Sequence, residues 1–74
     1  MTHHIVSTIS GEEATIPRNA TADRIRGHLV ALVKPKDTED EEACRALSEA
    51  MVAGDIVAAL PHAMALRVIV ETKG

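Results

Sequence analysis

The chain has 74 residues, a net charge of −3 and no Phe, Tyr or Trp. A chain of this length forms one small domain, so we treat residues 1–74 as a single unit. This composition rules out a nucleic-acid binder that stacks bases on Phe, Tyr or Trp, and an aromatic cage for a quaternary amine. No apolar run reaches the roughly 18 residues that cross a bilayer, and the first residues lack the pattern of a secretory signal. We therefore expect a cytoplasmic protein with no membrane partner.

The core must be built from aliphatic side chains alone: six Ile, five Leu, seven Val and three Met, together with twelve Ala and the single Cys44. Burying one large aliphatic side chain stabilises a fold by roughly 1.5–3 kcal/mol. Ordering one residue costs about 1.5 kcal/mol, so a chain this short gains little by folding alone. One cysteine cannot form an intrachain disulfide. We expect a homodimer, or another partner that buries further apolar surface.

The first element that the sequence predicts is a β-hairpin over residues 4–16. Polar and β-branched residues alternate along its first arm, which places Ile5 and Ile9 on one face. Gly11 supplies the turn, because glycine adopts positive φ without steric cost. Pro17 ends the returning strand, since it has no N–H to donate.

Two amphipathic helices follow the hairpin. Asn19 or Thr21 caps the first, and Pro35 ends it. The second is predicted over residues 39–53, where Thr38 begins a capping box and four acidic residues suit the helix dipole. The buried stripes contain Ala22, Ile25, Leu29, Leu32 and Val33 in the first helix, and Ala43, Cys44, Leu47, Ala50 and Met51 in the second.

The last third of the chain predicts a single helical turn and then a strand. Residues 55–60 form the turn, which Pro61 ends, and the strand pattern begins at Met64. The order β-β-α-α-β predicts an α+β domain: a three-stranded, mainly antiparallel sheet covered on one face by two helices.

Side chains that carry chemistry are present but do not form a recognisable site. The metal-capable residues show no ligand spacing, and we predict no metal site and no cofactor. They are His3, His4, His28, His62 and Cys44. Cys44 lies on an apolar stripe near acidic residues, which predicts a buried, unreactive thiol. The chain has neither a nucleophile elbow nor a glycine-rich phosphate loop, so we predict that it is not an enzyme.

Several apolar and acidic side chains lie off the predicted core. Val30 lies about 140° around its helix from Ile25, and Val52 about 140° from Leu47. Ile69 lies on the outward face of the last strand. Single exposed aliphatics are common, but together these three would form an interface patch. The acidic start of the second helix is either a solvated helix end or a surface for a basic partner. Its candidate interface residues are Glu39, Asp40 and Glu42.

Residues 4–29 resemble the opening of the swapped-hairpin DNA-binding antitoxins and transition-state regulators of the AbrB type. A strand, the Gly11 turn and the stretch from Ala14 to Arg18 before a helix carry this resemblance. The family commonly has a basic residue after the glycine, where this chain has two glutamates. It continues with strands, where this chain has an acidic helix.

These patterns leave two functions open. We expect a small non-enzymatic protein-binding regulator, inhibitor or accessory subunit that acts through a homodimeric or partner interface. The alternative is a dimeric DNA-binding regulator or antitoxin that uses the hairpin with Arg18, Arg24 and Arg26. The first 36 residues carry five basic and three acidic groups, whereas the rest carry three and eight.

Overall fold

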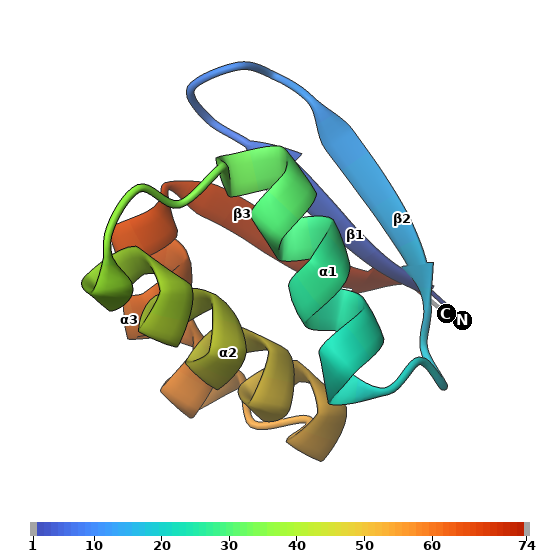
Figure 1. The fold of residues 1–74 in the computed structure, drawn as a ribbon. Coiled ribbons are helices and arrows are strands. Elements are labelled where there is room, and N and C mark those ends of the chain that lie inside the picture. Colours follow the sequence, from blue (N-terminus) through green and yellow to red (C-terminus); the bar gives the residue numbers. More distant parts are fainter. Residues whose placement is uncertain (1, 74) are drawn as a thin grey trace.

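The computed structural model describes residues 2–73, with side chains for residues 2–71. These residues form three strands and three helices in the order β1 (Thr2–Ser7), β2 (Glu13–Pro17), α1 (Ala22–Val33), α2 (Thr38–Ala53), α3 (Ile56–Leu66) and β3 (Val68–Lys73). The strands make one antiparallel sheet in the order β2-β1-β3, and the helices lie on one side of it (Figure 1). The expected α+β class is confirmed, with a third full helix in place of a single turn.

The β1–β2 hairpin forms as expected, but its first strand is shorter. Ile5 pairs with Ala14 of β2 and Val70 of β3, which places β1 at the centre of the sheet. β1 stops at Ser7, whose carbonyl accepts a hydrogen bond from the Gly11 N–H at 2.9 Å. Ile9 therefore lies in the turn, and the expectation that it extends the strand face of Ile5 is wrong.

The helices form a layer that covers one face of the sheet. α1 packs over β2 and α3 over β3, while α2 packs against both of these helices (Figure 1). Alternate residues of β1 turn toward this layer, so His3, Ile5 and Ser7 are buried. The core consists of Ile5, Ile16, Ile25, Leu29, Cys44, Leu47, Met51, Ala63, Leu66 and Val68.

The start of α2 lies one residue earlier than the sequence predicts. The carboxylate of Asp37, and not the hydroxyl of Thr38, caps the helix by accepting a hydrogen bond from the Asp40 N–H at 2.9 Å. Asp37 has an extended backbone, which suits a cap, whereas Thr38 already has helical geometry. Gly54 ends the helix with a positive φ of 72°, as expected.

α3 runs through Pro61, and this corrects the predicted turn and strand. Asp55 caps the helix by accepting a hydrogen bond from the Ala58 N–H at 3.0 Å. Pro61 removes one helical hydrogen bond, to the Val57 carbonyl, but the Ala, Leu and Met residues around it favour a helix. Met64 consequently lies on a helix, and the chain reverses into β3 at Arg67, where φ is 56°.

The cap of α2 gives a direct test of this fold. Replacing Asp37 by Ala should lower the free energy of unfolding by about 0.5–2 kcal/mol, because the Asp40 N–H loses its acceptor. Urea unfolding at a fixed protein concentration measures the change. Asp37→Asn keeps the acceptor and should recover most of the loss, and Thr38→Ala should have little effect. A larger loss for Thr38→Ala than for Asp37→Ala would contradict the observed cap.

Candidate functional site

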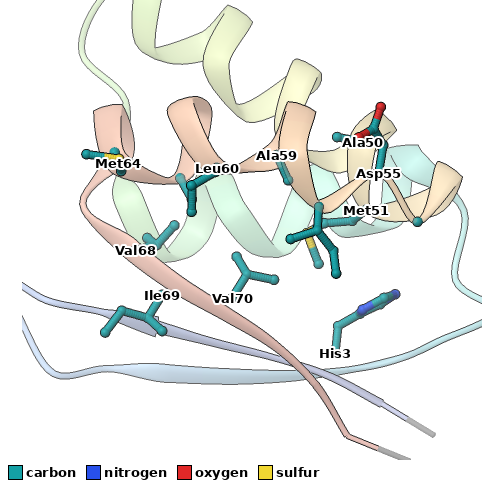
Figure 2. A pocket seen from close by; sticks show the side chains of 13 residues that line it. His3, Ala50, Met51, Asp55, Ala59, Leu60, Met64, Val68, Ile69 and Val70 are labelled. Atoms are coloured by element: carbon teal, nitrogen blue, oxygen red, sulfur yellow. The ribbon is translucent and has the colours of Figure 1, made fainter.

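A groove of about 420 Å³ lies between α3 and β3, at one edge of the sheet. Val68 and Val70 point into it from β3, and Met51 closes it at the end of α2 (Figure 2). Leu60 points from α3 toward the strand. The side chains that line the groove are mostly aliphatic, so the groove suits an apolar group better than a polar small molecule.

The helix above the groove leaves most of its large aliphatic side chains exposed. Ala63 and Leu66 are the buried residues of α3. The exposed fractions of its large side chains are 79% for Ile56, 84% for Val57, 59% for Leu60 and 69% for Met64. A helix that is apolar on all sides is ordinarily enclosed by protein or lipid, whereas α3 presents a continuous apolar surface to solvent.

Two polar side chains belong to the groove. Asp55 lies at the start of α3, where its carboxylate is already engaged as the helix cap. His3 lies on β1 beneath the opening and is buried (Figure 2). Burial, and then the positive charge of Arg18, hold the pKa of His3 below its ordinary value. A neutral imidazole therefore contributes to the floor of the groove at neutral pH.

Along the same edge of the sheet, alternate residues of β3 direct their backbone N–H and C=O groups away from β1. In β1, the Ser7 N–H donates toward β2, to the Glu12 carbonyl at 2.9 Å. The next N–H, of Thr8, donates to the other side, to the Arg67 carbonyl at 3.0 Å. Hydrogen-bonded pairs alternate along an antiparallel ladder. Ile69 and Glu71 therefore bond to β1, whereas the N–H and C=O groups of Val68 and Val70 point away from the sheet.

The three aliphatic residues selected from the sequence do not gather at one place. Ile69 borders the groove, and its side chain lies on the other side of β3 from Val68 and Val70 (Figure 2). Val30 on α1 and Val52 on α2 are exposed but do not line the groove. The structure thus associates one of the three with the candidate site.

The charged candidates also fall outside the groove. Glu39, Asp40 and Glu42 lie in the first two turns of α2, about 12–17 Å along that helix from Ala50, which lines the groove. Arg24 and Arg26 are two positions apart on α1, so their side chains leave the helix about 160° apart. Arg26 lies 3.7 Å from Asp23.

Arg18 follows β2 on the connection to α1. Of the three arginines, it is the one whose charge acts on His3, beneath the groove. Arg18 precedes α1, whereas Arg24 and Arg26 lie on it, and DNA binding through the three arginines stays a prediction.

Cys44 lies in the core with no exposed surface. Burial, followed by the charges of Asp40 and Glu41, raises the pKa of its thiol, which keeps it protonated. Across residues 2–73, no group of three His, Cys, Asp or Glu side chains is placed to hold a metal ion. Within the same range, no helix has both the length and the hydropathy that a membrane span requires.

Sequence analysis missed the exposed residues of α3 because it divided this helix between a turn and a strand. Pro61 marked the division, and the alternation of Met64 with Leu66 imitated a strand. The signal that identifies the surface was nonetheless present. Between Ile56 and Leu66, His62 is the one residue with a polar side chain, and a capping aspartate precedes the run.

Comparisons of the chain with models of known protein families, with curated proteins and with solved structures find no match. The site is therefore interpreted from its own geometry.

Burial of His3 predicts a pH dependence of stability. Its folded-state pKa lies below 6.5, the ordinary value, so the unfolded chain binds the proton more readily. The contribution of neutral His3 to stability should be complete above pH 6.5 and should decrease as the pH falls below it. Urea unfolding between pH 7.5 and 5.5 should show a shallower decline for His3→Gln than for the natural chain. Parallel curves would contradict the assignment.

Proposed function

We propose that this protein is a small, non-catalytic protein-binding regulator, inhibitor or accessory subunit whose association surface is α3 with the groove beside β3. The observation that carries the proposal is the exposed apolar surface of α3, which encloses Ala63 and Leu66 but leaves more than half of Ile56, Leu60 and Met64 exposed. A lone, reduced thiol fits a cytoplasmic setting.

The energetics favour a polypeptide as the ligand of this surface. Covering one large aliphatic side chain completely stabilises by roughly 1.5–3 kcal/mol. Four such side chains lie exposed on α3, so a partner that covers them gains more than the isolated domain obtains from the same residues. The groove continues this apolar surface down to Val68 and Val70. A partner with aliphatic side chains fits both parts at once.

The non-catalytic part of the proposal rests on the state of the most reactive side chain. Cys44 is enclosed by the core, and burial keeps its thiol protonated, so it is a poor nucleophile. It contributes to packing, in line with the expectation that the thiol is inert.

Photo-crosslinking inside the cells that make this protein tests the proposal. A benzophenone amino acid placed at Met64 should form a covalent adduct with a polypeptide, because this position lies beside the groove and is 69% exposed. The matched control is the same amino acid at Val30, an exposed aliphatic position on α1 away from the groove. Circular dichroism confirms that both variants are folded.

An adduct at Met64 without a comparable adduct at Val30 supports the association surface. Equal yields at the two positions, or no adduct at Met64, would contradict it.

A further inference from the structure

We propose that the partner at this surface is a second copy of the chain, joined through the outer edge of β3 so that two three-stranded sheets become one six-stranded antiparallel sheet. The inference rests on the proposed function, because it names the partner of the same surface. Three observations support the inference: the outward backbone groups of β3, the order of side chains along β3, and the position of the groove.

The backbone of β3 is prepared for another strand. Val68 and Val70 direct their N–H and C=O groups away from β1, and the strand order leaves no strand of residues 2–73 beyond them. The strand begins Val-Ile-Val, with no proline. An exposed β-branched edge of this kind is a template for pairing with another chain.

The opposite edge of the sheet is less suited to pairing. By the same alternation, β2 directs outward the backbone groups of Glu13, Thr15 and Pro17. Pro17 has no N–H to donate, and proline at an edge is a common way of preventing strand addition. The two edges therefore differ, and β3 is the one open to a second strand.

A two-fold axis perpendicular to the sheet fixes which residues can face each other. It keeps both helix layers on the same side, so residues of like face must pair. Pairing centred on Ile69 places Val68 opposite Val70 of the second copy, through the outward backbone groups of both. It also brings Arg67 opposite Glu71 of the second copy, which pairs opposite charges.

The registers centred on Val70 and on Glu71 are chemically poorer. Centring the axis on Val70 sets Ile69 against the Glu71 carboxylate of the second copy, and centring it on Glu71 sets two carboxylates against each other. The side-chain order of β3 therefore favours the register in which Ile69 meets its own counterpart. In that register Ile69, which is 52% exposed, becomes covered on the open face of the sheet.

The groove opens along the same edge, which makes the interface continuous. Figure 2 shows Val68 and Val70 of β3 bordering the groove, with α3 above them. Because the two-fold axis keeps both helix layers on one side, the exposed surface of α3 and the groove of each copy face those of the other. A stable interface buries about 800 Å² per partner, about one sixth of the 4826 Å² surface of this chain.

Sedimentation equilibrium tests the dimer. It compares the natural chain with two single variants, each of which places a proline on one edge of the sheet. The natural chain should have about twice the mass of the 7.9 kDa chain. Val70→Pro removes an N–H that points outward and should give a folded monomer. Thr15→Pro is the matched control, because it removes an outward N–H from the β2 edge and should leave the dimer intact. A monomeric natural chain, or a Val70→Pro variant that remains dimeric, would overturn the proposal.

Disulfide trapping tests the register and does not depend on the folding of Val70→Pro. Facing residues of a non-hydrogen-bonded pair have Cα atoms about 4.5 Å apart, within disulfide range. Ile69→Cys should therefore form a crosslinked dimer under mild oxidation. Glu71→Cys should not, because its counterpart lies about 13 Å away along the paired strands. Cys44 is enclosed and gives no background. A crosslink at Glu71→Cys and none at Ile69→Cys would overturn the register.

The mass of the Met64 adduct separates the two proposals. An adduct of two copies supports both. An adduct with a different polypeptide, together with a monomeric natural chain, overturns the dimer and retains the association surface. The absence of any adduct in a monomeric chain overturns both.

Discussion

α3 packs between α2 and β3 and buries only Ala63 and Leu66, and this limited burial governs the surface of the molecule. The other large residues of α3 keep most of their surface exposed. Ile56, Leu60 and Met64 border a groove that also contains Val68. The aliphatic side chains of the protein are thus divided between an enclosed core and an exposed apolar face, which we propose as the association surface.

Sequence periodicity predicted most of the fold, because the hairpin, α1 and α2 are elements whose local patterns agree with their packing. The errors arose where tertiary structure overrode a local sequence signal. Pro61 indicated a helix end, but one lost hydrogen bond does not outweigh the helix-forming residues around it and the packing of Leu66. Ile9 continued the strand alternation, but the Ser7 carbonyl turned the chain two residues earlier.

The site was less predictable than the fold, because it depends on which face of each helix meets another element. A helical wheel identifies Val30 and Val52 as outward residues, and both are exposed, yet they do not border the groove. The exposure of Leu60 follows from the packing of α3 over β3, which the sequence pattern does not show. The direction of the β3 backbone groups is set by pairing with β1, and no composition or periodicity encodes it.

Amide hydrogen exchange of the native protein tests most directly whether a second chain covers this edge. The Ile69 N–H bonds to β1 within one copy, whereas the N–H groups of Val68 and Val70 face outward. If the edge is paired, all three amides should be protected at high protein concentration, and Val68 and Val70 should lose protection on dilution. Rapid exchange at Val68 and Val70 at every concentration, beside a protected Ile69, would contradict the account.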